Sequence, residues 1–229
     1  MAIKFFAGGI ALHFYNPQIL KIDAAETRRY AGLRKAENFG EKNILDACEE
    51  ALLLIDVRAS WDVYDYKNFF VESEPPVLIV GNSIRKHLAA CEKVICMAVT
   101  VGAEIEREVT KKFSRGEYLS SVLLDAAATC AVEQAADALQ NHLAEIFAKD
   151  AYKLRARFSP GYGDWNLTEQ EKLFKICGAE KIGLSLTEAF MLEPRKSVTA
   201  IIGAIRNEEL GIRNETCATC DKLDCAMRK

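Results

Sequence analysis

The sequence centres on Asp125-Ala126-Ala127-Ala128-Thr129-Cys130-Ala131-Val132-Glu133-Gln134-Ala135-Ala136, the middle of the longest helical pattern in the chain, which runs from Glu117 to about Tyr152. Small side chains dominate this stretch, and they let a helix lie close against other elements. The pattern predicts one long helix or two consecutive ones. Asp125, Thr129 and Glu133 recur at four-residue spacing and share a face, which is either a solvated stripe on a buried helix or part of a binding site.

A short segment of unusual composition follows the helical pattern: Arg157-Phe158-Ser159-Pro160-Gly161-Tyr162-Gly163-Asp164-Trp165. Pro160 restricts its own backbone and that of Ser159, whereas Gly161 and Gly163 permit a positive φ and a close approach of a ligand to the main chain. Arg157 supplies a planar fork of donors that suits a carboxylate or a phosphate. The segment is either a ligand-binding loop or a turn whose arginine pairs with a structural carboxylate.

The remaining pattern predicts short helices and strands in mixed order. Helices are expected at residues 23–30, 41–57, 82–91, 103–112 and 168–177, and strands at 61–71, 77–80, 93–101, 184–192 and 197–205. The sequence shows neither a regular alternation of strand and helix nor a glycine-rich nucleotide-binding motif. We therefore expect an α+β fold in which a mixed, largely antiparallel sheet packs against helices, including the long alanine-rich one.

The composition argues against several classes of protein. The chain has 229 residues, 50% of them hydrophobic, which is enough to bury a sizeable core. With 30 basic and 33 acidic residues and a net charge of -3, it has no bulk positive field for nucleic acid or an anionic membrane. No segment approaches the ~20 apolar residues of a membrane span, and residues 1–15 are interpreted as a buried strand or an extended start rather than a signal peptide. We expect a cytoplasmic protein.

The eight cysteines divide into two groups. Five lie among apolar residues and are expected to be reduced core side chains: Cys48, Cys91, Cys96, Cys130 and Cys177. The other three form a C-x2-C-x4-C pattern in a polar C-terminus: Cys217, Cys220 and Cys225.

The C-terminal cysteines suggest a metal site. Two thiolates in a C-x2-C element can reach one metal, and a third makes three of the four ligands that zinc or an iron-sulfur cluster prefers. Asp221, Asp224, Cys177 or a partner residue would supply the fourth. The alternative is a loose tail whose thiols have no role. We expect one domain over residues 1–212 and, at 213–229, a tail that passes an electron or docks a partner.

Three motifs in order resemble a known family. They are Arg157-Phe158-Ser159-Pro160-Gly161-Tyr162, then Lys181-Ile182-Gly183-Leu184-Ser185-Leu186-Thr187-Glu188-Ala189-Phe190, then Ser197-Val198-Thr199. The reactivation domain of cobalamin-dependent methionine synthase resembles them with R-x-A-P-G-Y, I-G-x-x-L-T-E-S-F and S-V-S, in the same order and with similar gaps. The resemblance is specific over residues 131–200 and faint before them. It favours the ligand-loop interpretation of the segment that begins at Arg157.

The resemblance implies an S-adenosylmethionine site that closes over a corrinoid, so that oxidised cobalt is reduced and remethylated. Arg157 would hold the methionine carboxylate of the ligand, and Glu133, on the preceding helix, would hold its ammonium group. Ser159, which stands in place of the family alanine, and Gly161 would present backbone groups to the adenosine. Tyr162 would turn its ring toward the ligand or the corrinoid edge.

The sequence also departs from the family that it resembles. Gly163-Asp164-Trp165 replaces a proline, an alanine and a cysteine, so this half of the loop is where we expect a different corrinoid partner to be recognised. The sequence has no D-x-H-x-x-G cobalamin motif and no folate or homocysteine module. The resemblance therefore implies a stand-alone accessory subunit of a separate cobalamin-dependent methionine synthase or related corrinoid methyltransferase, with a flavodoxin or ferredoxin as electron donor.

The residues leave two other functions open. The first is a metal or iron-sulfur redox or assembly protein that keeps this fold, uses its cysteine tail and binds no S-adenosylmethionine. The second is a free-standing S-adenosylmethionine-dependent methyltransferase that acts on a small molecule.

Overall fold

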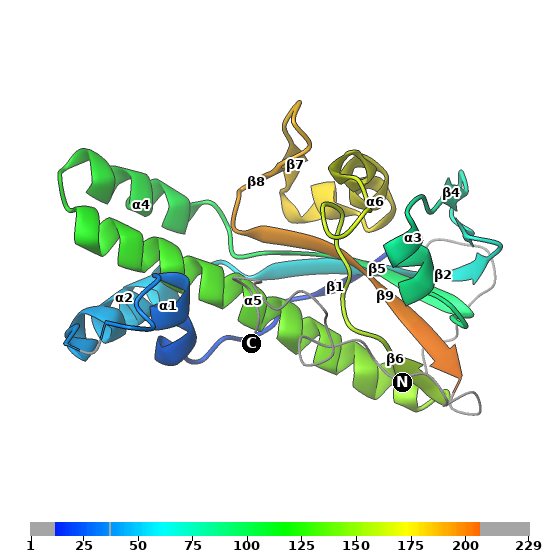
Figure 1. Ribbon diagram of the computed structural model, residues 1–229, viewed down its shortest axis with the longest axis horizontal. Helices are drawn as coiled ribbons and strands as arrows, with labels where there is room; N and C mark the ends of the chain where they lie inside the picture. Colours follow the sequence, from blue (N-terminus) through cyan, green and yellow to red (C-terminus); the bar gives the residue numbers. More distant parts are fainter. Residues whose placement is uncertain (1–11, 37, 207–229) are drawn as a thin grey trace.

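An antiparallel sheet forms the centre of the protein in the computed structural model, which describes residues 12–36 and 38–206 (Figure 1). Its long strands are β2 (Arg58–Lys67), β5 (Lys93–Thr100) and β9 (Ser197–Arg206), and short strands extend it: β1 (His13–Tyr15), β3 (Phe70–Val71), β4 (Val77–Leu78) and β6 (Tyr152–Leu154). The strand order is β4-β3-β2-β5-β9-β6, and β1 also pairs with β2. Every pairing in this sheet is antiparallel, so the predicted α+β class with a largely antiparallel sheet is confirmed.

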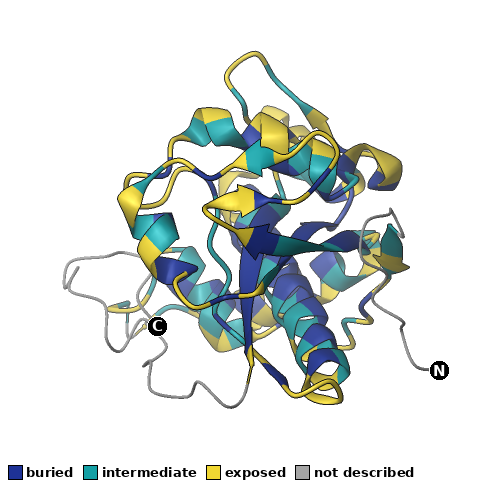
Figure 2. Cartoon of the chain, turned by 90° about the vertical axis from the view of Figure 1, so that its right-hand side faces the viewer, coloured by how far each residue is buried: buried dark blue, intermediate teal, exposed yellow. Residues whose placement is uncertain are grey.

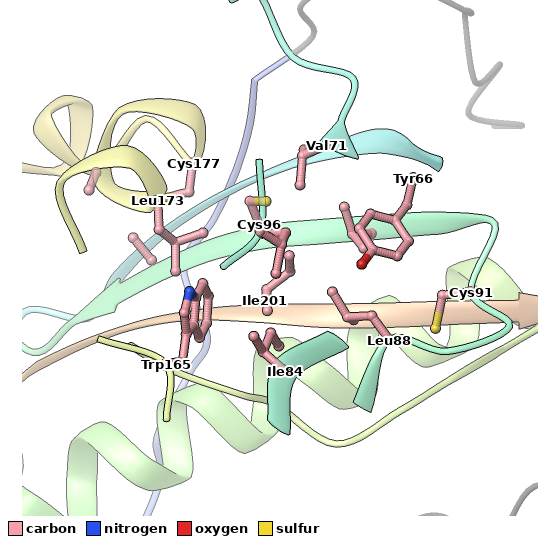
Figure 3. Packing of buried hydrophobic residues seen from close by; sticks show 14 of the residues in the cluster. Tyr66, Val71, Ile84, Leu88, Cys91, Cys96, Trp165, Leu173, Cys177 and Ile201 are labelled. Atoms are coloured by element: carbon pink, nitrogen blue, oxygen red, sulfur yellow. The ribbon is translucent and has the colours of Figure 1, made fainter. Parts of the chain in front are cut away.

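Other elements cover both faces of the sheet. Successive side chains of a strand point to opposite sides, so each long strand contributes to the packing on both faces. In β5, Ile95, Met97 and Val99 pack toward the long helix α5 (Tyr118–Ala148). Val94, Cys96 and Ala98 face the other layer, which contains α3 (Asn82–His87), α6 (Gln170–Ile176) and the short helix η2 (Ala179–Ile182) (Figure 3). In Figure 2 the central strands are accordingly dark blue.

The long helix α5 is a single element of 31 residues. It ends before β6, so the helical pattern that was predicted to reach Tyr152 extends past the end of the helix to the first residue of a strand. Its N-terminal half packs against α1 (Ala24–Tyr30), α2 (Glu41–Leu54) and α4 (Glu104–Ser114), and its C-terminal half lies under the sheet (Figure 1). Ala127, Ala131 and Ala135 are wholly buried. Their small side chains allow the close approach of neighbours on both sides of the helix, as the sequence predicts.

Three predicted strands differ from the structure. Residues 61–71 form a hairpin of β2 and β3, which turns at Asn68 and Phe69, both with positive φ. Of residues 77–80, only Val77 and Leu78 belong to a strand, at the sheet edge, and Val80 is 49% exposed. Residues 184–192 form two short paired strands, β7 (Ser185–Leu186) and β8 (Leu192–Glu193), because the Thr187 amide donates to the Met191 carbonyl and closes a turn between them.

The five cysteines predicted for the core are all free and buried: Cys48, Cys91, Cys96, Cys130 and Cys177. Within the described residues, no helix is both long enough and apolar enough to cross a membrane. The predicted boundary at residues 212 and 213 lies outside the described residues.

Candidate ligand-binding site

The backbone before the glycine-rich loop continues from β6 along the edge of β9 that does not pair with β5. The Arg155 amide donates to the Gly203 carbonyl at 2.8 Å, and Phe158 and Ile201 exchange two hydrogen bonds of 3.0 and 2.9 Å. Because neighbouring side chains of an extended chain alternate, Phe158 packs into the layer of α3 and α6, whereas Arg157 points to the opposite side. The loop therefore presents its arginine to α5.

Arg157 is held by three side chains of α5. Its Nη1 donates to Asp137 Oδ1 at 2.8 Å and to Gln140 Oε1 at 3.2 Å, and its Nη2 donates to Glu133 Oε2 at 3.2 Å. The side chain of Arg157 is only 17% exposed. Three partners on one rigid helix fix the position and the plane of the guanidinium, so the group is pre-oriented.

These contacts leave part of the guanidinium available. An arginine carries five N–H donors, and three are used by the bonds to α5. One hydrogen of Nη2 and the hydrogen of Nε have no acceptor among the described residues. Nε and Nη2 together form one edge of the fork, which is the shape that binds both oxygens of a carboxylate. The two interpretations of Arg157 are thus compatible, since the arginine pairs with carboxylates and still presents donors.

Glu133 lies beside Arg157, so two of the predicted site residues are in direct contact. The Glu133 side chain is 31% exposed and uses Oε2 for Arg157. Burial raises the pKa of Tyr30, and the negative charge of Glu133 raises it further, which places this tyrosine near the same carboxylate. On the same helix face, Asp125 and Thr129 are occupied by Lys196 Nζ, each at 2.8 Å. Asp125 and Thr129 therefore form a structural contact with Lys196 and are not part of the candidate site.

The loop tip uses some of its backbone groups internally. The Gly161 amide donates to the Trp165 carbonyl at 2.8 Å, and the Tyr162 amide donates to the Ser159 carbonyl at 3.3 Å. The Ser159 amide and the Gly161 carbonyl have no hydrogen-bond partner among the described residues. Gly161 has φ of +91°, and Tyr162 is 58% exposed. A ligand at this tip would therefore meet one backbone donor, one backbone acceptor and the tyrosine ring.

The sequence model of the vitamin B12 dependent methionine synthase activation domain matches residues 82–210, which is more than half of the chain. The chain belongs to this activation-domain family. The match covers α5, the Arg157 loop and β9, the elements that build the candidate site.

A solved structure of the same kind has a similar fold. The crystal structure of the MetH reactivation domain bound to AdoHcy superimposes with a TM-score of 0.56 at 12% sequence identity, over 91% of this chain and 82% of that chain. At this identity the likeness concerns the fold. No curated protein is significantly similar to the chain in sequence.

The second half of the loop, where this activation domain departs from the motif, anchors the loop to the core. Trp165 is 2% exposed and packs among Ile84, Leu173 and Ile201 (Figure 3). Asp164 accepts hydrogen bonds from the Asn82 amide at 2.7 Å and the Ser83 amide at 2.8 Å, at the start of α3. The expectation that this half recognises a partner does not fit a buried tryptophan and a helix-capping aspartate.

The Asp164 contact predicts a pH-dependent contribution to stability. The backbone amides of Ser83 and Asn82 hold the pKa of Asp164 below its usual range, so the contribution is fully present above the ordinary aspartate pKa and is lost as pH falls through the lower folded value. We expect Asp164→Asn to lower the melting temperature at pH 7, and the difference from wild type to shrink below about pH 4. Thermal melts from pH 7 to pH 3 measure it, and a constant difference would contradict the assignment.

Sequence reasoning missed two members of this cluster in the activation domain, Asp137 and Gln140. Asp137 continues the four-residue spacing of Asp125, Thr129 and Glu133, so the sequence carried a signal for it. Gln140 gave no such signal, because its role depends on where the Arg157 loop lies.

A hollow of about 720 Å³ lies elsewhere on the described surface, between α4 and the turn after β8. Charged side chains dominate its lining: Arg58, Glu106, Arg107, Lys111, Glu193 and Arg195. Its cations already have carboxylate partners, as in the pairs of Arg107 with Glu104 and of Lys111 with Glu108. No residue predicted for the ligand lines this hollow, and we place the candidate site at Arg157 because the pre-oriented donors are there.

The predicted metal ligands Cys217, Cys220 and Cys225 lie outside the described residues. Within residues 12–36 and 38–206, no three side chains of the metal-binding types converge. Cys177, one candidate for a fourth ligand, is wholly buried, and burial raises the pKa of its thiol to about 12. Since metals bind the thiolate, its environment disfavours that role.

Proposed function

We propose that the chain binds S-adenosylmethionine at the Arg157 loop and serves as a reactivation subunit for a corrinoid methyltransferase. The observation that carries the proposal is the guanidinium of Arg157, which three α5 side chains hold in place while its Nε hydrogen and one Nη2 hydrogen have no acceptor among the described residues. Membership of the activation-domain family and the AdoHcy named for the similar structure support the choice of ligand.

Each predicted residue has a task in this proposal. Arg157 binds the carboxylate of the methionine part through Nε and Nη2, and Glu133 accepts a hydrogen bond from the ammonium group. The Ser159 amide and the Gly161 carbonyl contact the adenosine. Tyr162 covers the ligand from the solvent side.

The partner in this proposal is a separate cobalamin-dependent methionine synthase or a related corrinoid methyltransferase. The cobalamin of that partner would supply a cobalt that, once reduced by one electron from a flavodoxin or ferredoxin, takes the methyl group of S-adenosylmethionine and releases S-adenosylhomocysteine. The chain itself would position the sulfonium ligand. Family membership supports this part of the proposal.

Calorimetric titration of the full chain with S-adenosylmethionine tests the ligand. We expect saturable binding at one site per chain. Absence of binding at millimolar ligand would reject the proposal and leave the redox or assembly function.

Reconstitution with a corrinoid methyltransferase tests the proposed reactivation role. A corrinoid methyltransferase in the Co(II) state, mixed with this chain, a reductant and S-adenosylmethionine, should regain the absorption of the methylated corrinoid in proportion to the chain added. Ligand binding without any such return would instead favour a free-standing methyltransferase.

A further inference from the structure

We infer that the hollow between α4 and the turn after β8 is a separate binding site, which takes a phosphorylated small molecule that carries hydroxyl groups. Neither Arg157 nor its α5 partners line this hollow, so the inference goes beyond the proposed function and does not depend on it. The volume of about 720 Å³ lies in the range of pockets that hold whole small molecules.

The register of the sheet brings the cations of the hollow together. Arg58 begins β2 and pairs with Thr100 at the end of β5, and Thr100 pairs in turn with Ser197 at the start of β9. Arg195 precedes Ser197 by two residues and α4 follows β5, so all these elements meet at one end of the long strands (Figure 1). The cations that line the hollow therefore come from three elements: Arg58, Arg107, Lys111 and Arg195.

Arg58 brings a guanidinium without hydrogen bonds to the hollow. Its Nε is buried and has no hydrogen-bond partner, and it forms only an ion pair with Asp56 Oδ2 at 3.3 Å. Its Nη1 and Nη2 donate to no acceptor among the described residues either. Gly183 leaves room for this group, because a Cβ at that position would lie 2.9 Å from Arg58 Nη1. The two terminal nitrogens are thus available to a ligand.

The two cations of α4 also keep donors. Arg107 binds Glu104 through Nε and Nη2, and both hydrogens of Nη1 have no acceptor among the described residues. Lys111 has three donors and uses one of them for Glu108, at 3.0 Å. Each pair joins residues three apart on the surface of one helix, and such pairs are weak. They therefore allow both cations to bind a ligand as well.

Two carboxylates line the same hollow, and the protein uses one of them. Glu106 accepts a hydrogen bond from the Lys196 amide at 2.5 Å through Oε1, and its Oε2 lies 3.7 Å from Arg195 Nε. That second distance is too long for a hydrogen bond, so Arg195 also keeps its donors. Glu193 is exposed and forms no ion pair with any residue that the structure describes. Its oxygens can accept hydrogen bonds from hydroxyl groups of a ligand.

The placement of the cations favours a phosphate over a carboxylate. A phosphate group presents three strong acceptor oxygens, whereas a carboxylate presents two in one plane. Here the donors come from the start of β2, from α4 and from the chain before β9. Cations on three separate elements match a group whose oxygens point in several directions, and the neighbouring Glu193 matches hydroxyl groups on the same molecule.

Calorimetric titration of the full chain with ribose 5-phosphate, ribose, inorganic phosphate and succinate tests the ligand class. We expect saturable binding of ribose 5-phosphate at one site per chain. Ribose should bind at least about 10-fold more weakly, because it lacks the charged hydrogen bonds of the phosphate. Succinate should bind more weakly than inorganic phosphate. Absence of saturable binding of ribose 5-phosphate at millimolar concentration would overturn the inference, and so would tighter binding of succinate than of either phosphate compound.

Substitutions test the location of that site. Arg58→Gln and Arg195→Gln should each weaken binding of ribose 5-phosphate by about 10-fold. Arg206→Gln is the matched control, because it removes an exposed arginine at the other end of β9 and should leave the affinity unchanged. The Arg195 side chain is 64% exposed, so this variant tests the site even if Arg58→Gln fails to fold. Undiminished binding by Arg195→Gln, or equal losses in Arg195→Gln and Arg206→Gln, would show that the inference is wrong.

Titration of the same variants with S-adenosylmethionine separates this site from the Arg157 site. Arg195→Gln should bind S-adenosylmethionine as wild type does, and an equal loss of affinity for both ligands would overturn the claim of two sites. If wild type binds S-adenosylmethionine but no ribose 5-phosphate, this inference alone is rejected. The opposite result would reject the proposed function and support the phosphate site.

Discussion

Replacing Trp165 by alanine should lower the free energy of unfolding by about 3–5 kcal/mol, the largest effect that we expect from any single substitution in the loop. The indole is 2% exposed and packs among Ile84, Leu173 and Ile201, where the layer of α3 and α6 meets the sheet. Removal of the ring would leave a cavity that the surrounding strands and helices cannot close. Urea denaturation followed by circular dichroism measures the change.

Trp165→Phe is the matched control for that prediction. The Nε1 hydrogen of Trp165 is buried and has no acceptor among the described residues, and phenylalanine removes this unsatisfied donor while it keeps most of the apolar volume. We therefore expect the phenylalanine variant to lose less than half as much stability as the alanine variant. Equal losses, or a loss below about 1 kcal/mol for alanine, would show that Trp165 does not anchor the loop.

Replacing Arg157 by alanine should weaken S-adenosylmethionine binding by about 1.5–3 kcal/mol, or roughly 10- to 150-fold, the range for a hydrogen-bonded contact between charged groups. The substitution removes the fork for the ligand carboxylate and also leaves Glu133 and Asp137 without their shared cation. Both effects act against binding of the carboxylate. Calorimetric titration of the two proteins gives the difference.

Arg157→Lys and Arg206→Ala serve as controls. Lysine keeps the charge but lacks the planar fork, so its affinity should lie between those of wild type and the alanine variant. Arg206 forms an exposed pair with Glu92 at the far end of β9, and its loss should leave affinity unaltered. Undiminished binding by Arg157→Ala would reject the role of Arg157 in the proposed site.

Local sequence patterns were sufficient for the elements that carry the site. The alanine-rich stretch gave the register of α5, and that register places Glu133 on the face that meets Arg157. The β-branched runs predicted β5 and β9 within a residue or two of their ends. These features depend on residues that are close in sequence, and for that reason local patterns could predict them.

The remaining features depend on contacts between distant residues. Phe158 pairs with Ile201, and this pairing helps to bring Arg157 within reach of Gln140. Trp165 stands between polar and glycine residues, so its burial follows from the approach of α3 and α6 rather than from its neighbours. Residues 184–192 begin with an alternating pair of leucines and end with the apolar run Ala189-Phe190-Met191-Leu192, and neither pattern distinguishes a hairpin from one continuous strand.

The buried alanines of α5 couple the position of the proposed ligand site to the packing of the core. Glu133, Asp137 and Gln140 project from a helix whose other sides are packed against the sheet and against α2, with Ala131 and Ala135 wholly buried. A larger residue at either alanine would push the helix outward and carry all three side chains away from an arginine that β9 holds still. A larger side chain at Ala131 or Ala135 should therefore disturb the proposed site as well as the core, although neither alanine belongs to the Arg157 cluster.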